Sequence, residues 1–306
     1  MKVLVTGGAG FCGSHVADRL IEAGYQVVVV DDLSTGKREH LNPKTKFYQA
    51  DIRTPDLLQV LEAEKPDYVS HHAAQISIQR SLRDPLADAS TNILGSLNLL
   101  EACCKVGIKK FIYISTGGAV YGEPIYVPCD EEHPVQPLCH YGASKHAVEH
   151  YLHLYGKLYG LNYTILRYPN IYGPRQDPHG EAGVVAIFTQ RMLKGAKAVI
   201  NGSGEQERDF LYVGDAAEAN LLALQKGDGG IYNLGWCRGV SIKRVFGLLK
   251  DLTGYTQNAV YGPAVPEVFK ICLEARRALE ELGWEPRVSL EEGLRRTVEY
   301  FRSRAG

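Results

Sequence analysis

Three glycines at a spacing of three residues follow a short apolar run at the start of the chain. Residues 3–5 form the run, Gly7, Gly10 and Gly13 follow it, and a helical pattern begins at Phe11. A turn without Cβ atoms lets a pyrophosphate approach the backbone. The helix behind it directs free N–H groups and its positive end at that phosphate. Strand, turn and helix in this order indicate a dinucleotide-binding unit; the alternative is a turn that only packs helix on strand.

Apolar runs and helical patterns alternate through the first half of the chain. The runs predict strands at residues 26–30, 47–51, 68–72, 111–115 and 162–167, and helices at 57–61, 86–106 and 141–159. Such alternation is typical of a parallel sheet covered by helices on both faces. We therefore predict an α/β fold of the Rossmann type, with a doubly wound parallel sheet and a smaller C-terminal α/β lobe.

The pattern changes after residue 170, which divides the chain into two predicted lobes. The first covers residues 1–170 with returns near 209–237, where 210–213 and 231–233 rejoin it, and the second covers 171–306. Helices are predicted in the second lobe at 184–193, 242–252 and 274–282. A last helix begins after Ser289, with Glu292 three residues on, which is a capping-box pattern.

An aspartate ends the second predicted strand. The carboxylate of Asp31 can accept hydrogen bonds from the ribose hydroxyls of an adenosine, and its charge would repel a 2′-phosphate. NAD is therefore favoured over NADP as the dinucleotide. Lys37 and Arg38 follow closely enough to keep NADP as an alternative.

A tyrosine and a lysine four residues apart open the helix predicted at 141–159. Tyr141 and Lys145 share one helix face. A neighbouring ammonium favours the phenolate, which would lower a phenol pKa of about 10 towards neutrality. A phenolate in this position can take a proton from an alcohol or sugar hydroxyl.

Charge and cysteine usage exclude several classes of function. The formal net charge is −1, which gives no electrostatic reason to expect a nucleic acid or a membrane surface as partner. The cysteines contain no Cys-x-x-Cys pair and the histidines lack ligand spacing, so we expect no metal site. No apolar run approaches a membrane span, and Met1 leads directly into the first strand. We therefore expect a cytoplasmic protein.

The sequence resembles the extended short-chain dehydrogenase/reductase family, and within it nucleotide-sugar enzymes of the UDP-glucose 4-epimerase type. The resemblance covers nearly the whole chain. It rests on the glycine spacing, on Asp31 and on the Tyr141–Lys145 pair, and further on residues 32–36, 71–74, Asn92, 120–122, 166–175 and 208–210. By this resemblance the residues that contact NAD are Gly7, Gly10, Phe11, Cys12, Asp31, Asp32, Ser34, Thr35, Gly36, Asp51, Ile52, His72, Ala73, Ala74, Gln75, Asn92, Tyr141, Lys145 and Tyr168.

The resemblance also implies the residues that act on the substrate. Tyr141 would be the catalytic base, with Lys145 beside it. A Ser or Thr hydroxyl after the fifth strand would hold the reacting sugar oxygen. Counting from the strand gives Thr116; Ser115 is the alternative, because successive side chains of a strand face opposite sides.

The remaining implications concern the diphosphate and the assembly. Asn170 and Arg208 would bind the diphosphate of the nucleotide sugar. Family members commonly carry a second Arg in an Arg-x-Gly-Asp/Glu stretch, but residues 264–267 read Ala-Val-Pro-Glu. Arg175 or Lys270 would then take its place. A homodimer is expected, formed through the helices at 86–106 and 141–159.

Three functional interpretations are open. The first is an NAD-dependent 4-epimerase that interconverts UDP-glucose and UDP-galactose through a 4-keto intermediate. The second is a UDP-glucuronate decarboxylase or epimerase, or another nucleotide-sugar enzyme of the family; dehydratases need an Asp-Glu pair where this chain has Gly117 and Gly118. The third is a non-catalytic NAD-binding sensor, which would have no use for the Tyr141–Lys145 pair.

Overall fold

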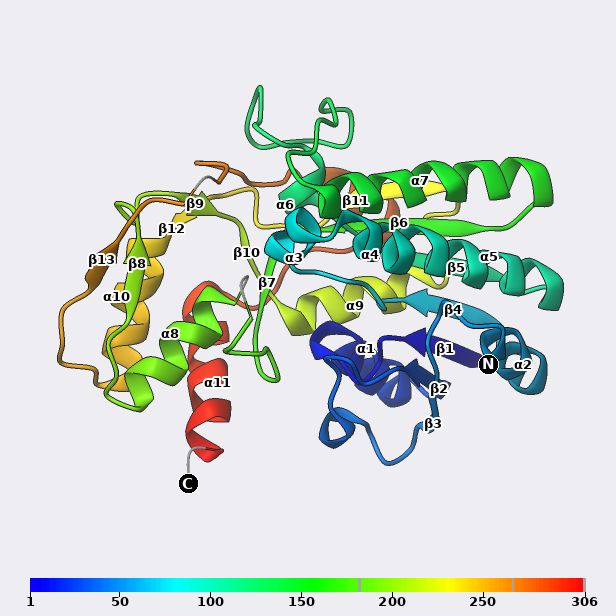
Figure 1. Cartoon of the computed structure of the whole chain (residues 1–306), viewed down its shortest axis with the longest axis horizontal. Coiled ribbons are helices and arrows are strands. Elements are labelled where there is room, and N and C mark those ends of the chain that lie inside the picture. Colours follow the sequence, from blue (N-terminus) through cyan, green and yellow to red (C-terminus); the bar gives the residue numbers. More distant parts are fainter. Residues whose placement is uncertain (181–182, 266, 305–306) are drawn as a thin grey trace.

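The computed structural model describes residues 1–180, 183–265 and 267–304. Within this described part a parallel sheet of seven strands forms the centre of the molecule, in the order β3-β2-β1-β4-β5-β6-β11 (Figure 1). The strands are β1 Lys2–Thr6, β2 Gln26–Asp31, β3 Lys46–Gln49, β4 Tyr68–His71, β5 Lys110–Thr116, β6 Tyr163–Tyr168 and β11 Gly230–Asn233. The predicted doubly wound parallel sheet is confirmed.

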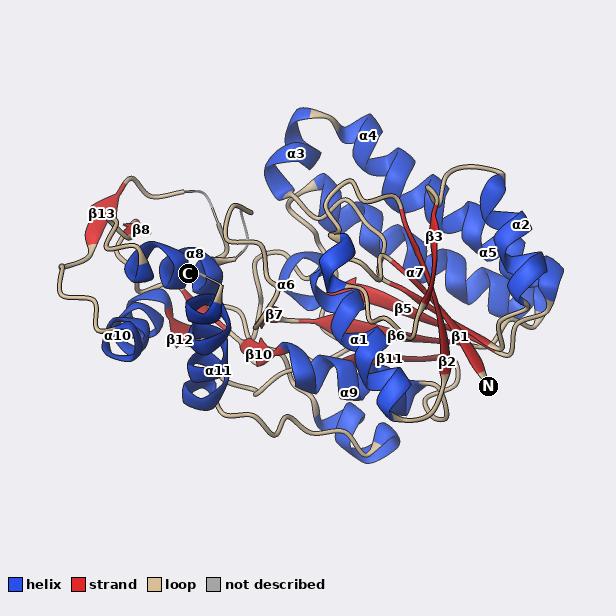
Figure 2. Ribbon diagram, turned by 90° about the horizontal axis from the view of Figure 1, so that it is seen from below, coloured by secondary structure: helices blue, strands red, loops and turns tan. Residues whose placement is uncertain are grey.

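Alternate residues of the central strands pack against helices on the two faces of the sheet (Figure 2). Val3 and Val5 lie in one hydrophobic cluster with Val16 of α1, and Leu4 lies in the other with Leu99 of α5. This is the period of two that a strand buried on both faces requires. The first face carries α1 Phe11–Glu22 and α9 Val213–Ala223, and the second carries α2 Asp56–Glu64, α5 Gly95–Val106 and α7 His140–Tyr159.

A third hydrophobic cluster forms the core of the C-terminal part of the chain. It is built around three helices, α8 Val184–Leu193, α10 Ile242–Thr253 and α11 Leu290–Ser303 (Figure 1). The strand pairs beside them are β7 Asn170–Tyr172 with β10 Phe210–Tyr212, β8 Val199–Asn201 with β13 Val260–Gly262, and β9 Glu207–Arg208 with β12 Val240–Ser241. The short elements are η1 Arg38–His40, α3 Ile78–Arg83, α6 Gly117–Val120 and η3 Ala278–Leu282.

Several predicted boundaries are wrong. The single helix predicted at 86–106 is divided into α4 Pro85–Ala89, a π-helical turn η2 Ser90–Leu94, and α5. The helix predicted at 274–282 is reduced to little more than η3. Residues 210–212 form β10 in a two-stranded sheet with β7, and Leu211 packs in the hydrophobic cluster of β1 and α1. At Ser289 the hydroxyl accepts from the Glu292 N–H as predicted. The Glu292 carboxylate, however, binds arginines of its own helix, so the reciprocal half of the capping box is not formed.

None of the helices in the described residues combines the length and apolar character needed to cross a membrane. The cytoplasmic location expected from the sequence stays a prediction.

The glycine turn gives a prediction on stability. A Cβ at Gly13 would lie 2.3 Å from the carbonyl oxygen of Gly7, whereas a Cβ at Gly247, also inside a helix, would meet no atom within 4 Å. Gly13→Ala should therefore lower the free energy of unfolding by about 1–3 kcal/mol through overpacking. Gly247→Ala should raise it by about 0.5–1 kcal/mol through helix propensity. Urea denaturation measures both, and equal effects would contradict this account of the turn.

Candidate functional site

The glycine turn lies against the loop that follows β4, at the carboxyl ends of the central strands. Gly7 has a φ of +67°, and a Cβ there would lie 2.6 Å from the backbone nitrogen of Ala73. Gly10 caps α1 and no side chain accepts a hydrogen bond from the first turn of this helix. The turn therefore offers uncapped N–H groups and a backbone that a ligand can approach closely, which fits a pyrophosphate.

Asp31 ends β2 beside this turn and is 7% exposed. Its carboxylate accepts hydrogen bonds from the backbone nitrogens of Ala9 at 3.0 Å and Leu33 at 2.8 Å. Burial raises the pKa of Asp31, and these hydrogen bonds oppose the shift. Asp51, at the end of the neighbouring strand, is instead ion-paired with Arg53 at 2.5 Å. The carboxylate at residue 31 is thus fixed in place by the loop, while that at residue 51 has a partner of its own.

Tyr141 and Thr116 meet where β5 ends and α7 begins. The hydroxyl of Thr116 acts on the phenol of Tyr141 as a hydrogen-bonding neighbour that lowers its pKa, and both residues remain partly exposed. Lys145 is 4% exposed, and its Nζ lies 4.2 Å from the ring centroid of Tyr113. The site therefore combines two partly exposed hydroxyls with one buried lysine amine.

Ser115 does not share this position. Its side chain is 2% exposed and donates to a carboxylate oxygen of Glu149 at 2.5 Å. Glu149 is also bound by the guanidinium of Arg167 at 2.6 and 3.0 Å. The alternation of side chains along β5 thus directs Thr116 to Tyr141 and Ser115 to a buried ion pair.

In the protein alone, burial opposes the acidity that the sequence predicts for Tyr141. Burial raises the pKa of Tyr141 above its ordinary value, and the hydrogen bond from Thr116 is the influence that lowers it. Burial also lowers the pKa of Lys145 to about 7, against the attraction of Glu149 and Asp88. Both groups pay a desolvation cost, so each is biased towards its neutral form.

A hydrogen-bonded cluster of polar side chains lies between α4 and α7. The side-chain oxygen of Asn92 accepts from the backbone nitrogen of Gln75 at 2.8 Å, and its amide nitrogen donates to Ser144 at 3.1 Å and Asp88 at 3.1 Å. Gln75 donates to the same oxygen of Asp88 at 2.8 Å. Two of the expected cofactor contacts, Gln75 and Asn92, are thereby fixed to the helix that carries Lys145.

A second cluster lies on the side of the glycine turn. Tyr168 accepts a hydrogen bond from the amide of Asn220, whose oxygen accepts from Ser70 at 3.1 Å. Ser70 also contacts His72 Nε2 at 2.9 Å, while His72 Nδ1 is buried without a partner among the described residues. Burial lowers the pKa of His72 to about 3, so this imidazole is neutral.

Asn170 lies across from the two hydroxyls. A Cβ at Gly118 would lie 3.8 Å from both the Asn170 side-chain oxygen and Thr116 Oγ1, and it would meet nothing closer. A side chain at residue 118 would therefore project into the space between Thr116 and Asn170. Glycine leaves this space free and provides no acid or base there.

Arg208 is not free in this structure. Its guanidinium forms an ion pair with Glu267 and donates to the carbonyl oxygen of Glu207 at 2.8 Å. The carboxylate that pairs with Arg208 therefore belongs neither to Asp209 nor to Glu207, the two acidic residues next to it in the sequence. Lys270 is ion-paired with Glu207 at 3.1 Å, and Arg175 with Asp18 at 2.7 Å. In the stretch 264–267, Pro266 lies outside the described residues.

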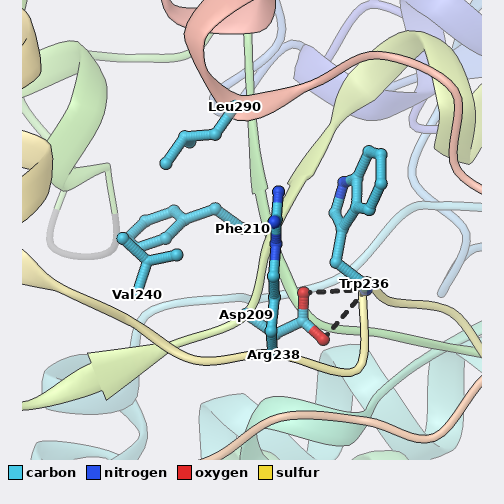
Figure 3. A pocket seen from close by; sticks show the side chains of 6 residues that line it. All are labelled: Asp209, Phe210, Trp236, Arg238, Val240 and Leu290. Carbon is cyan, nitrogen blue, oxygen red and sulfur yellow. Dashed lines mark hydrogen bonds between the residues drawn. The ribbon is translucent and has the colours of Figure 1, made fainter.

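The next residue, Asp209, turns its carboxylate into the protein (Figure 3). It accepts from the backbone nitrogen of Trp236 at 3.0 and 3.1 Å and from that of Leu273 at 3.3 Å. Burial raises its pKa to about 7.

The cavity beside Asp209 measures about 10 Å³, which is room for about one water. It is lined by Asp209, Phe210, Trp236, Arg238, Val240 and Leu290. Asp209 therefore fixes the backbone behind Arg208 and does not form a sugar site.

The structure brings most of the expected residues to one edge of the sheet. Ser115 is separated from the hydroxyl pair, and Arg208 is engaged by Glu267. Sequence reasoning missed the buried acids Asp88 and Glu149. Their signal was present: Asp88 lies four residues before Asn92, and Glu149 four residues after Lys145, which is the spacing of one helix face.

Comparisons with known proteins agree with this geometry. The model of the NAD dependent epimerase/dehydratase family matches residues 3–235. The structure of UDP-glucose 4-epimerase from Thermotoga maritima with UDP-glucose superposes with a TM-score of 0.98 and 52% identity, covering 100% of both chains. The complex of the Thermus thermophilus UDP-glucose 4-epimerase with NAD gives 0.94 and 44%, covering 99% of both. A putative UDP-glucose 4-epimerase of Methanocaldococcus jannaschii is 47% identical over 303 residues, 98% of each chain.

The two hydroxyls of β5 should differ in their effect on stability. Ser115→Ala removes a buried hydrogen bond to a carboxylate, so the free energy of unfolding should fall by about 1.5–3 kcal/mol. Thr116→Val removes a partly exposed hydrogen bond between neutral groups and should cost about 1 kcal/mol or less. Thermal or urea unfolding measures both variants. A larger loss at Thr116 than at Ser115 would reverse the assignment of the two side chains.

Proposed function

Because the chain belongs to the NAD dependent epimerase/dehydratase family, we propose that it is a nucleotide-sugar 4-epimerase that interconverts UDP-glucose and UDP-galactose. The observation that carries this proposal is that Tyr141 and Thr116 act on each other where β5 ends and α7 begins, with the buried Lys145 one turn further along α7. The full-length similarity to UDP-glucose 4-epimerases from two bacteria supports the choice of sugar and nucleotide.

The residues at the carboxyl ends of the strands suit NAD as the cofactor. The uncapped N-terminus of α1 would receive the pyrophosphate, and Asp31 would receive the adenosine ribose. Its carboxylate disfavours the 2′-phosphate of NADP. When bound, NAD supplies the oxidising and reducing power of the reaction, accepting a hydride from the sugar carbon and returning it. We propose residues 1–170, with returns near 209–237, as the lobe that binds it.

Side chains of the protein remove and return the proton of the sugar 4-hydroxyl. Tyr141 removes this proton as the sugar is oxidised and returns it to the same oxygen as the sugar is reduced. Thr116, hydrogen-bonded to Tyr141, holds the sugar oxygen at the phenol. Because burial raises the pKa of Tyr141, a charged Lys145 is needed to favour the phenolate. The 4-keto sugar must then present its other face before it is reduced.

The diphosphate would bind at the boundary between the NAD-binding lobe and the C-terminal lobe, residues 171–306. We assign it to Asn170 and Arg208, whose guanidinium suits phosphate oxygens. Glu267 occupies that guanidinium in the structure, so the diphosphate would replace this carboxylate. Elimination of water, as a dehydratase performs it, has no support here because Gly118 provides no acid or base beside Thr116.

Replacing the proposed base tests the function. Tyr141→Phe should lower turnover of UDP-glucose and UDP-galactose about 10²–10⁴-fold, since a positioned acid–base group contributes that much. Tyr151→Phe, on the same helix but at the surface, is the matched control and should retain full turnover. Epimer formation without added NAD is followed by chromatography, and the NAD content of each variant is measured.

Two outcomes would contradict the proposed reaction. Unchanged turnover in Tyr141→Phe would remove the phenol from the chemistry. Release of carbon dioxide from UDP-glucuronate, without epimerisation of any UDP-hexose, would favour the decarboxylase. NAD bound with no exchange at C4 of any nucleotide sugar would favour the sensor.

We also propose that the protein is a homodimer. Helix α7 lies side by side with α5 (Figure 1) and carries exposed apolar side chains in its second half. They include Leu154, Leu158 and Tyr159. Leu154 and Leu158 are one helical turn apart, 47% and 68% exposed, and thus form a stripe that a second copy could cover.

Charge on this stripe should separate the dimer. Leu154→Glu with Leu158→Glu should shift the sedimentation coefficient from that of a dimer to that of a monomer, because the interface would bury two carboxylates. Leu279→Glu, 49% exposed in the turn η3, is the control and should leave the coefficient unchanged. A wild-type protein that sediments as a monomer at micromolar concentration would contradict the dimer.

A further inference from the structure

Asp88 is a buried carboxylate that the proposed reaction does not yet use. It lies in α4 and is 1% exposed. One oxygen accepts hydrogen bonds from Gln75 at 2.8 Å and Asn92 at 3.1 Å. The other oxygen is buried and has no hydrogen-bond partner among the described residues. Burying an unpartnered carboxylate oxygen is costly, so a purely structural acceptor would be better served by an amide.

The charges around Lys145 explain what this carboxylate does. Glu149, one turn further along α7, also raises the pKa of Lys145, and more strongly than Asp88, but its charge is shared with the guanidinium of Arg167, which binds both of its oxygens. His71 and His72, which face Lys145 from the β4 side, are neutral because burial lowers the pKa of both well below the usual range. The phenols Tyr113 and Tyr141, and the thiols Cys12 and Cys139 that act on Tyr141, all have a raised pKa and are hence neutral.

Of the carboxylates that act on Lys145, Asp88 is the one without an ion pair among the described residues. Its packing against α7 runs through Asn92, which also donates to Ser144, the residue before Lys145. We propose that Asp88 is a positioning residue whose uncompensated negative charge keeps Lys145 in its ammonium form behind Tyr141. The inference rests on the acid–base role proposed for this pair.

The direction of the effect follows from the charge. Asp88 raises the pKa of Lys145 and opposes the lowering by burial; it also raises the pKa of Tyr141. Removing the charge should therefore lower both pKa values. Lys145 would lose its proton at a lower pH, and the phenol would lose its proton at a lower pH as well. Both limbs of a pH–rate profile should then move to lower pH, which a loss of packing alone would not cause.

The substitution Asp88→Asn removes the charge with little change of shape. The asparagine oxygen can take the place that accepts from Gln75 and Asn92, and its amide nitrogen then occupies the position that has no donor opposite. Asp84→Asn is the matched control. Asp84 caps the same helix from an exposed position, and asparagine is an equally good cap. Asp88→Ser is a second variant that removes the charge and retains an acceptor.

The first readout needs no substrate, so it is independent of the proposed function. In the free protein, the ¹³Cε shift of Lys145 is followed against pH by NMR and assigned by its loss in Lys145→Arg. We expect the midpoint to fall by about one pH unit in Asp88→Asn and Asp88→Ser, the size of shift that a close charge produces. It should be unchanged in Asp84→Asn. If the protein is active, the pH–rate profile of the variant should shift in the same direction.

Three results would overturn the inference. A Lys145 midpoint that coincides with the wild type in either folded variant removes the electrostatic role. Activity that falls with no movement of either limb assigns Asp88 to holding Gln75 and Asn92. Failure of both variants to fold assigns it to the stability of α4. An inactive wild type with the expected NMR shift, by contrast, would leave the charge role intact and refute only the proposed epimerase.

Discussion

The proposed site depends on a lysine side chain that is held inside the protein. Lys145 is 4% exposed, with the face of the Tyr113 ring 4.2 Å away and carboxylates on α4 and on its own helix. A buried ammonium is stable only where opposite charge and polarisable surface replace its water. That requirement accounts for the buried acids nearby. Glu149 is ion-paired with Arg167, and Asp88 has no ion pair among the described residues. Without them burial would leave a neutral amine behind the phenol.

The parallel sheet explains why groups distant in sequence meet here. Strands β1, β2, β4, β5 and β6 are parallel and all end at the same edge, so their last residues lie at one end of the sheet. The hydroxyl of Thr6 at the end of β1, for example, lies 2.7 Å from His71 Nδ1 at the end of the neighbouring strand β4, although the two residues are far apart in the sequence. The two faces of the sheet keep separate apolar cores, so the polar groups are confined to the strand ends.

Much of this arrangement could be predicted from the sequence, because it follows from local patterns. The glycine turn, Asp31 at the end of β2, and the Tyr141–Lys145 spacing are all local. The break of the helix predicted at 86–106 could not be predicted, since the π-helical turn at Ser90–Leu94 is stabilised by tertiary hydrogen bonds of Asn92 to Gln75 and Ser144. The choice between Ser115 and Thr116 also required knowing that Glu149 lies behind β5.

Glu267 neutralises Arg208, and residues 264–267 lack the second arginine that members of the family commonly carry there. With Arg208 paired to Glu267 and Lys270 paired to Glu207, these two cations are neutralised before substrate arrives. Binding of a diphosphate therefore replaces the Glu267 carboxylate at Arg208 by a phosphate. The binding free energy that results is the difference between two ion pairs and not the full energy of one. A second arginine without an acid would bind the diphosphate more tightly. It would also slow release of a product with the same diphosphate, since a group that binds both sugars equally does not speed the reaction itself.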